Sequence, residues 1–323
     1  MTIATDRAKP EIAILGQVRR ALIADLEARF VCHHVFAEAN RLAYLRAHGG
    51  RLRGAVSHGM AGIKAAEMEL MPRLEICAIN GVGLETTDLD VARERGVVIT
   101  TTPVLYDDVA DLAIALALAA CRRVVEGDRF VRSGAWREGR LPLGRKLSGM
   151  RAGLIGLGRI GSEVAHRLQA FKCAISYVDP AVDPARGDVA YRRVADAVTL
   201  ARDSDILFLA AAGAAKGKGA PIVDSAVLEA LGPQGIFVNV ARGWLVDEAA
   251  LVELLGNGGL SAAGLDVFDD EPNVPAGLLG LDNVVLTPHI ASSTEETMGA
   301  MGDTVVANLD SWFAGRGALT AVP

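Results

Sequence analysis

The sequence predicts an α/β protein built on parallel β-sheets, and three observations lead to this prediction. Short apolar runs alternate with stretches of helical periodicity along most of the chain, which is the pattern of successive βα units. The composition is 51% hydrophobic but only 5% aromatic, as expected where small aliphatic side chains pack helices onto buried parallel strands. The length of 323 residues gives room for two domains with sizeable cores.

The first hundred residues show this alternation without a phosphate-binding glycine motif. A longer helix follows, with Asp107 and Asp108 at its start and Arg122 and Arg123 near its end, as a helix dipole favours. Residues 126–150 are polar and contain several Gly and Pro, so we expect an irregular arm rather than a packed element. The expected strands are 12–15, 55–56, 76–79 and 97–99, and the expected helices are 21–30, 39–48, 87–95 and 109–125.

A glycine-rich turn between two expected strands stands out in the middle of the chain. An apolar run at 152–155 ends in Gly156-x-Gly158-x-x-Gly161, and a helical pattern follows. A second apolar run at 174–178 ends in Asp179, eighteen residues after the last of these glycines. The glycines allow a tight turn and close approach of the backbone to a pyrophosphate, and the acid can accept hydrogen bonds from a ribose. The arrangement predicts a dinucleotide-binding βαβ unit.

Three polar residues lie near the ends of later strands. Arg242, Glu271 and His289 each follow an apolar run, and the carboxyl ends of parallel strands are where ligands bind in such sheets. An imidazole can donate a proton to a carbonyl, a carboxylate can orient it, and a guanidinium can hold a substrate carboxylate. Together they describe reduction of a 2-oxo acid. The later strands are expected at 206–210, 236–240, 262–267 and 284–286, with helices at 225–231, 248–255 and 294–313.

Charge and cysteine usage narrow the classes of function. The net charge is −6 and the arginines are scattered, so we expect neither a nucleic acid nor a membrane surface as partner. The longest apolar run, 112–121, is too short to cross a bilayer, and the first ten residues show no signal-peptide pattern. Adjacent His33 and His34 chelate poorly, so no metal site is expected. The four cysteines are widely spaced without a CxxC pair, which favours free thiols and a cytoplasmic location.

Four motifs in order make the chain resemble the D-isomer-specific 2-hydroxyacid dehydrogenases over nearly its whole length. Within this family it is most similar to the glyoxylate/hydroxypyruvate reductases and hydroxyphenylpyruvate reductases. Stretches 107–113 and 175–177 are responsible for that closer similarity. The motifs are the glycine turn at 156–161, Asn-Val-Ala-Arg-Gly-Trp-Leu-Val-Asp at 239–247, the run from Gly264 to Pro272, and Thr-Pro-His at 287–289.

The resemblance implies roles for individual residues in reduction of a 2-oxo acid such as glyoxylate, hydroxypyruvate or an aryl analogue. It places the catalytic residues at Arg242, Glu271 and His289, with Arg242 on the substrate carboxylate and His289 as the general acid. Asp266 matches an acid that holds the nicotinamide carboxamide. Cofactor contacts are implied for Gly156, Gly158, Arg159, Ile160, Gly161, Asp179, Ala241 and Asp266, and substrate contacts for Ser57, His58, Gly59, Val82, Gly83 and Arg242.

The resemblance also implies a discontinuous arrangement of two doubly wound domains. A Rossmann cofactor domain, residues 102–287, is inserted in a flavodoxin-like substrate domain formed by residues 1–101 and 288–323. Members of the family form homodimers through the cofactor domain and the arm near 126–150, so a homodimer is expected here.

Two departures from the family pattern concern the cofactor. Relatives often have a basic pair after the second cofactor strand, suited to a 2′-phosphate, whereas this chain has Asp179 and Pro180. A carboxylate repels that phosphate, so NAD is expected, with NADP kept open by Arg186. The segment 211–220 is an unusual loop rich in Ala, Gly and Lys where relatives have a shorter Pro-Leu-Thr turn.

Two alternatives stay open on the sequence. One is a non-catalytic NAD-binding regulator of the corepressor type, against which the intact Arg–Glu–His set argues. The other is another dehydrogenase of the same family, such as phosphoglycerate dehydrogenase, although no regulatory extension is expected after Pro323.

Overall fold

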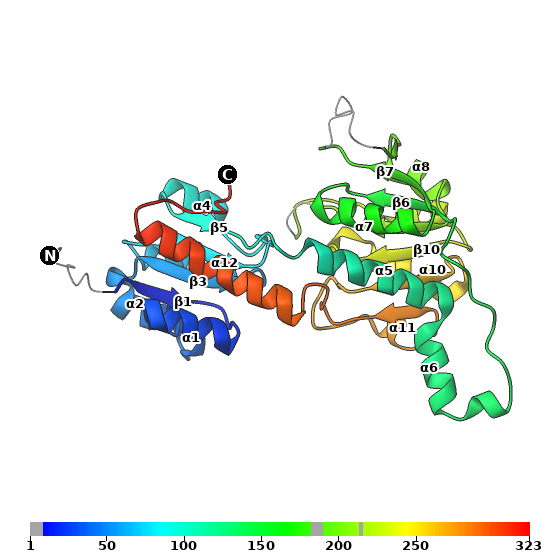
Figure 1. Cartoon of the computed structure of the whole chain (residues 1–323), viewed down its shortest axis with the longest axis horizontal. Coiled ribbons are helices and arrows are strands. Elements are labelled where there is room, and N and C mark those ends of the chain that lie inside the picture. Colours follow the sequence, from blue (N-terminus) through cyan, green and yellow to red (C-terminus); the bar gives the residue numbers. More distant parts are fainter. Residues whose placement is uncertain (1–8, 182–189, 213–215) are drawn as a thin grey trace. The chain divides into compact units, whose positions relative to one another are not determined.

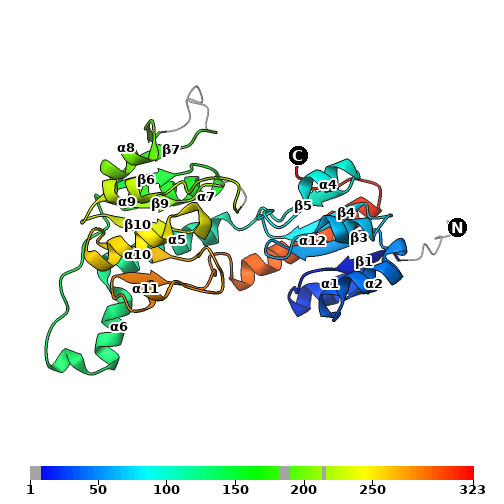
Figure 2. The same ribbon diagram turned by 180° about the vertical axis from the view of Figure 1, so that it is seen from behind.

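The computed structural model describes residues 9–181, 190–212 and 216–323. The chain divides into two compact units, each with its own parallel sheet (Figures 1 and 2). Unit 1 contains the residues up to Leu105 together with Thr294–Pro323, and unit 2 contains Tyr106–Ser293. The chain therefore leaves unit 1, forms unit 2, and returns.

Unit 1 has a five-stranded sheet in the order β2-β1-β3-β4-β5, and its strand pairs are all parallel. This is the strand order of flavodoxin-like folds. The strands are β1 (Glu11–Ile14), β2 (Val31–His33), β3 (Gly54–His58), β4 (Ile76–Asn80) and β5 (Val98–Thr100). The helices are α1 (Arg20–Arg29), α2 (Arg41–His48), α3 (Ala65–Glu69), α4 (Leu89–Glu94) and α12 (Glu295–Phe313), with 3₁₀ turns η1 (Val35–Ala37) and η2 (Gly49–Arg51).

Both faces of this sheet are buried, which explains its continuous apolar strands. Alternate residues of β1 and of the position after it enter different clusters: Ile12 and Ile14 pack with α1 and α12, whereas Ala13 and Leu15 pack with α2, α3 and α4. The C-terminal helix α12 thus completes one face of a sheet whose strands are all N-terminal. Residues after α12 lie along the β5 edge of the sheet, where the Val322 amide donates to the Ile99 carbonyl at 2.8 Å.

Unit 2 has a seven-stranded parallel sheet in the order β12-β11-β10-β9-β6-β7-β8. The order reverses between β6 and β9, as in doubly wound dinucleotide-binding folds, and ligands bind at such a switch point. Two doubly wound parallel sheets confirm the predicted fold class. The strands are β6 (Arg151–Ile155), β7 (Ala174–Val178), β8 (Arg192–Arg193), β9 (Ile206–Leu209), β10 (Ile236–Asn239), β11 (Ala262–Leu265) and β12 (Val284–Leu286).

The helices of unit 2 correct the prediction for the arm. The expected helix 109–125 ends early, because Arg123 adopts a left-handed backbone with φ of 54°. A second helix then covers part of the segment expected to be irregular, with Asp128 and Arg132 paired at 2.8 Å across one turn. The helices are α5 (Tyr106–Arg122), α6 (Val124–Arg132), α7 (Arg159–Ala170), α8 (Ala197–Arg202), α9 (Ser225–Leu231), α10 (Glu248–Asn257) and α11 (Ala276–Leu279), with 3₁₀ turns η3 (Ala135–Arg137) and η4 (Gly243–Leu245).

Five short elements were not expected from the sequence, namely β2, β8, α3, α8 and α11. Each has at most six residues, which is too few to show a periodicity. Within the described ranges, no helix combines the length and the apolar character that a membrane span requires.

Candidate active site

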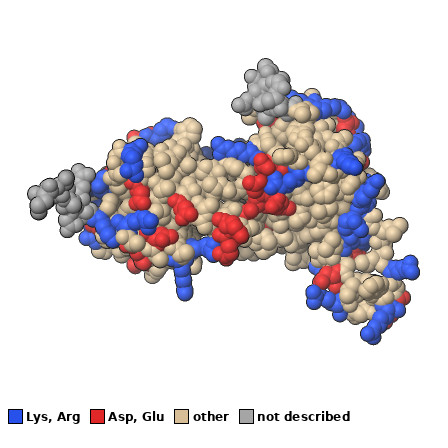
Figure 3. Space-filling model, viewed as in Figure 1, with Lys and Arg blue, Asp and Glu red and all other residues tan. Residues whose placement is uncertain are grey.

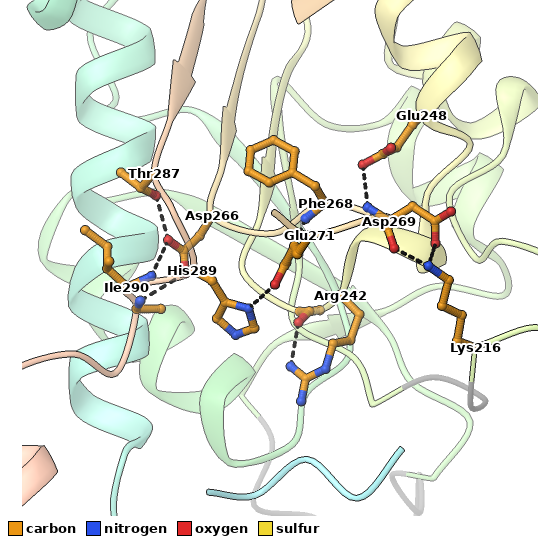
Figure 4. Close-up of polar contacts among 12 residues, drawn as sticks. Lys216, Arg242, Glu248, Asp266, Phe268, Asp269, Glu271, Thr287, His289 and Ile290 are labelled. Atoms are coloured by element: carbon orange, nitrogen blue, oxygen red, sulfur yellow. Dashed lines mark hydrogen bonds and ion pairs between the residues drawn. The ribbon is translucent and has the colours of Figure 1, made fainter. Parts of the chain in front are cut away.

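Three neighbouring strands of unit 2 place the predicted polar residues at one edge of the sheet. The strands β10, β11 and β12 are adjacent and parallel, so their carboxyl ends lie together. Arg242 follows β10, Glu271 lies in the loop after β11, and His289 follows β12. Figure 4 shows the three side chains close to one another, as the sequence predicted.

His289 and Glu271 form a hydrogen-bonded pair. The imidazole Nδ1 lies 2.7 Å from Oε2 of Glu271, and the other carboxylate oxygen, Oε1, accepts the backbone N–H of Phe268 at 2.9 Å. The Phe268 amide therefore holds the carboxylate through the oxygen that does not face the ring. The carboxylate, held in this way, orients the imidazole. The His289 side chain is 36% exposed, so the ring can still meet a ligand.

The backbone at His289 is left-handed, with φ of 51°, an uncommon conformation for a residue with a side chain. Asp266 holds it there. The Asp266 carbonyl accepts the His289 N–H at 2.8 Å, and its fully buried carboxylate accepts bonds from Thr287 Oγ1 at 2.7 Å and from the Ile290 and Ala291 amides at 2.9 Å (Figure 4). Asp266 thus organises the turn that presents the imidazole. Its expected contact with a nicotinamide carboxamide stays a prediction.

Arg242 is positioned by its own strand end. The Asn239 side chain bridges the turn, accepting the Ala241 N–H and donating to the Arg242 carbonyl, both at 3.0 Å. The guanidinium donates to the Ala241 carbonyl at 2.7 Å and lies 6.0 Å from the centre of the Trp244 ring. These contacts hold a planar donor group that can bind a carboxylate through two parallel bonds.

Gly243 joins the arginine loop to the loop that contains Glu271. A Cβ atom at this position would lie 1.8 Å from the Phe268 carbonyl carbon and 2.1 Å from the Asp269 nitrogen. Only glycine allows so close an approach of two backbones. Gly243 therefore allows the loops that contain Arg242 and Glu271 to lie against each other.

The glycine turn of unit 2 fits a dinucleotide. Gly156 has φ of 91° and a Cβ there would lie 2.6 Å from the Ala211 Cα, whereas a Cβ on Gly161 would lie 2.2 Å from the Gly156 carbonyl oxygen. At Gly158, by contrast, a Cβ would meet open space. Gly158 is the N-cap of α7 and provides no side-chain cap, so the first amides of the helix are available to a pyrophosphate.

Asp179 directly follows β7, as predicted, and closes the glycine turn. Its carboxylate accepts the Leu157 N–H at 2.7 Å and the Ala181 N–H at 2.8 Å. Arg159, at the start of α7, donates to the Tyr106 hydroxyl and lies over that ring. Arg186, considered above as a partner for a 2′-phosphate, lies outside the described residues.

The remaining predicted positions lie in unit 1. The turn with Ser57, His58 and Gly59 ends β3, and Val82 and Gly83 follow the adjacent strand β4, so the two segments pack side by side. A Cβ on Gly59 would lie 3.3 Å from the Gly83 carbonyl oxygen. Burial lowers the pKa of His58, so its ring is uncharged near neutral pH. The substrate contacts expected of these residues stay predictions.

Two charged residues beside Glu271 escaped the sequence analysis. Glu248, in the first turn of α10, accepts the Asp269 N–H at 2.9 Å, and Lys216 forms an ion pair with Asp269 at 3.0 Å. In the sequence, the Asp-Glu pair at 247–248 indicates only the start of a helix. Lys216 lies in a loop, where no periodic pattern points to a function. No group of three or more potential metal ligands occurs in residues 9–181, 190–212 and 216–323.

Comparison with known proteins identifies relatives of this chain. Residues 114–291 match the family model described as the NAD-binding domain of the D-isomer-specific 2-hydroxyacid dehydrogenases. A glyoxylate/hydroxypyruvate reductase A from Arabidopsis thaliana and a hydroxyphenylpyruvate reductase from Plectranthus scutellarioides are each 44% identical over 299 residues, covering 92% of this chain and 94% of the relative. A crystal structure of an NADPH-dependent glyoxylate/hydroxypyruvate reductase from Sinorhizobium meliloti, with NADP and malonate, matches with a TM-score of 0.88 at 38% identity, covering 98% of this chain and 97% of that chain.

Proposed function

The chain belongs to the D-isomer-specific 2-hydroxyacid dehydrogenase family, and we propose that Arg242, Glu271 and His289 are its catalytic residues. The enzyme reduces a small 2-oxo acid to the D-2-hydroxy acid with NAD(P)H, the substrate being glyoxylate, hydroxypyruvate or an aryl analogue. The observation on which the assignment rests is the 2.7 Å bond between His289 and Glu271, with Arg242 at the end of the neighbouring strand.

Each of the three side chains has one task in this reaction. When bound, the reduced nicotinamide cofactor supplies a hydride to the carbonyl carbon of the substrate. Arg242 binds the substrate carboxylate and orients the carbonyl, and the protonated ring of His289 donates a proton to the carbonyl oxygen. Glu271 accepts a hydrogen bond from the ring and stabilises its charged form. In the reverse direction the neutral ring accepts the proton.

For the turns of unit 1, we propose substrate contacts separately from those of unit 2. Ser57 is fully buried and its hydroxyl donates to the Gly62 carbonyl at 2.6 Å, which shapes the turn around His58 and Gly59. We assign backbone contacts with the substrate carboxylate to Val82 and Gly83, and side-chain or backbone contacts to the turn at 57–59.

A panel of 2-oxo acids with NADH and NADPH tests the proposed function. We expect cofactor oxidation with glyoxylate, hydroxypyruvate or an aryl pyruvate, and chiral chromatography should find the D isomer wherever the product is chiral. Tight cofactor binding without turnover of any 2-oxo acid would instead favour the corepressor-type regulator. A regulator that only binds the cofactor does not need an oriented imidazole. In this protein, hydrogen bonds hold both the ring and the backbone of His289.

We expect NADH to bind more tightly than NADPH. Two backbone amides fix the carboxylate of Asp179 at the glycine turn. There it would repel a 2′-phosphate and accept bonds from ribose hydroxyls. The double variant Asp179→Ser/Pro180→Arg should shift the ratio of dissociation constants toward NADPH by roughly tenfold or more, since it removes a repulsion and adds a cation. Titration of the cofactor fluorescence measures both constants. Each single variant serves as a control, and equal affinity of the unmodified protein for both cofactors would contradict the expectation.

We also propose that the protein is a cytoplasmic homodimer. Helix α6 buries none of its residues, and the projection that it begins leaves Trp136 68% and Leu143 97% exposed. Figure 3 shows uncharged surface between charged side chains on this projection. A second copy of the chain is the partner that can cover such a surface. The four free cysteines support a reducing compartment.

Sedimentation velocity tests the proposed dimer. The unmodified protein should sediment as a dimer at micromolar concentration, and Trp136→Asp should raise the dimer dissociation constant by about a hundredfold, the scale of a lost aromatic anchor. Leu319→Asp is a matched control, because Leu319 is similarly exposed, at 62%, in unit 1. A stable monomer of the unmodified protein would count against the proposal.

A further inference from the structure

The carboxyl ends of β3 and β4 place two polar side chains next to each other on one face of the unit 1 sheet. His58 and Asn80 are partners in the register of these two parallel strands, so their side chains point to the same side of the sheet. Two residues earlier on the same face, Val56 and Ala78 belong to the apolar cluster that the sheet forms with α1 and α12. The apolar core of this face therefore ends at a polar edge.

A glycine at the end of β1 leaves room for the His58 ring at this edge. A Cβ atom on Gly16 would lie 2.5 Å from Cδ2 and 2.9 Å from Nε2 of His58. The order of the sheet reverses between β1 and β3, and doubly wound sheets bind ligands at the carboxyl side of such a reversal. The His58 side chain is partly exposed, and burial lowers its pKa. The neutral ring therefore offers one hydrogen-bond donor and one acceptor at this edge.

The side chain of Asn80 contains a buried polar atom without a partner. The residue is only 9% exposed, and within the described ranges no donor lies within hydrogen-bond distance of its amide oxygen Oδ1. Native proteins pair nearly all such atoms, because an unpaired buried acceptor destabilises the fold. The amide can turn about its Cβ–Cγ bond, so that either its oxygen or its NH₂ group can face a ligand. Its hydrogen-bonding capacity is therefore available to a bound molecule.

The loop that follows Asn80 is fixed through both backbone groups of Gly81. The Gly81 N–H donates to Thr102 Oγ1 at 2.8 Å, and the Gly81 carbonyl accepts the Thr102 N–H at 2.9 Å. Asn80 directly precedes this anchor, and Val82 and Gly83, whose amides we assigned to the substrate carboxylate, directly follow it. A carboxylate bound there should place C3 of a 2-oxo acid, two carbons away, within reach of the Asn80 side chain.

We propose that Asn80 is a specificity-determining residue that selects 2-oxo acids with a hydroxyl group on C3, by binding this hydroxyl through its side-chain amide. The inference rests on the proposed function, because it takes the substrate carboxylate to be bound by the amides of Val82 and Gly83. A hydroxyl both donates and accepts hydrogen bonds, so it suits the amide and also the neutral ring of His58. A methyl group or an aromatic ring on C3 leaves the buried amide unpaired, and such a substrate is disfavoured.

Hydroxypyruvate and pyruvate differ only in this hydroxyl, so the ratio of their kcat/KM values measures the selection. The native enzyme should prefer hydroxypyruvate by roughly a hundredfold, and the nearly isosteric Asn80→Leu should lower this ratio by roughly tenfold or more. Asn80→Ala removes the amide without adding a branched apolar group, and should lower the ratio in the same direction. Thermal melting shows whether each variant is folded.

Ser311→Ala is the matched control for removal of an unpaired buried polar group. Ser311 is 3% exposed, and its hydroxyl has no hydrogen-bond partner among the residues that the structure describes. It lies in α12 next to Trp312, whose Nε1 donates at 3.0 Å to Glu75, directly before β4. Ser311 therefore lies towards the opposite edge of the sheet from Asn80, and its replacement should leave the ratio unchanged.

Binding of the two products separates this proposal from the proposed function. D-Glycerate and D-lactate differ by the same hydroxyl, and neither reacts when the cofactor present is NADH, because both partners are then already reduced. Isothermal titration calorimetry of the NADH complex should find tighter binding of D-glycerate, and Asn80→Leu should remove this difference.

The two assays together decide the role of Asn80. Equal kcat/KM values of the native enzyme for hydroxypyruvate and pyruvate, a preference that both Asn80 variants leave intact, or an equal effect of Ser311→Ala would overturn the proposal. Equal binding of D-glycerate and D-lactate by the native protein would do the same. If the binding results are as expected while no 2-oxo acid is reduced, the proposed function fails and the assignment of Asn80 stands.

Discussion

Replacing His289 with alanine should lower kcat for reduction of the 2-oxo acid by about a hundredfold or more, the usual scale for loss of a general acid. The expectation follows from the geometry around the ring. Glu271 orients its Nδ1 side, Asp266 fixes its backbone, and the remaining face stays open to a ligand. Because no hydrogen bond joins the ring to the glycine turn among the described residues, the dissociation constant of NADH should stay nearly unchanged.

Steady-state kinetics and cofactor fluorescence together measure this result. His166→Ala is the matched control, because His166 is an exposed residue of α7 in the same unit. It should retain native kcat. A His289→Ala protein that binds NADH normally and keeps more than about a tenth of native kcat would show that another group donates the proton.

Replacing Arg242 with alanine should lower kcat/KM by roughly a thousandfold, because a charge-assisted bidentate contact with the substrate carboxylate is lost together with the orientation that it provides. Arg242→Lys keeps the charge but not the planar fork, so its loss should be intermediate. The arginine bonds to the Ala241 carbonyl within its own turn, and the turn itself is held by Asn239 and Gly243. The fold and NADH binding should therefore survive the substitution.

The comparison of kcat/KM with the NADH dissociation constant distinguishes a substrate role from a structural one. A parallel loss of NADH affinity in Arg242→Ala would mean that the guanidinium supports the cofactor site instead. A substrate analogue that lacks the carboxylate provides a second check, since it should be reduced equally poorly by the native and variant enzymes.

Much of the fold could be predicted because periodicity and glycine placement are local signals. The strand 174–178 and its terminal Asp179 are where the apolar run placed them. Helix α6 was missed because its short segment was taken together with the polar, Gly- and Pro-containing residues that follow it up to residue 150. The elements β2, β8, α3, α8 and α11 are too short for a period to appear.

Motifs in the sequence could predict that His289 and Glu271 form a pair, but not the contacts that hold the pair in place. Nothing in the sequence shows that Asp266 holds the turn of His289, because its partners Thr287, Ile290 and Ala291 lie more than twenty residues away. Likewise, Lys216 follows β9 and Asp269 follows β11, and they form an ion pair because these strands lie on either side of β10 in the sheet. Such contacts depend on strand order, which is a property of the whole fold.

The pH dependence of reduction by Glu271→Gln tests the central claim most directly. In the proposed mechanism the protonated ring of His289 is the acid, so reductive activity should fall as pH rises, and the charge of Glu271 favours that protonated form. Glutamine keeps the shape and one hydrogen bond but removes the charge. The alkaline limb of kcat/KM against pH should therefore move to lower pH, while NADH affinity stays nearly native. An unshifted limb in a folded, NADH-binding Glu271→Gln enzyme would contradict the assigned pairing of Glu271 and His289, however slow that enzyme is.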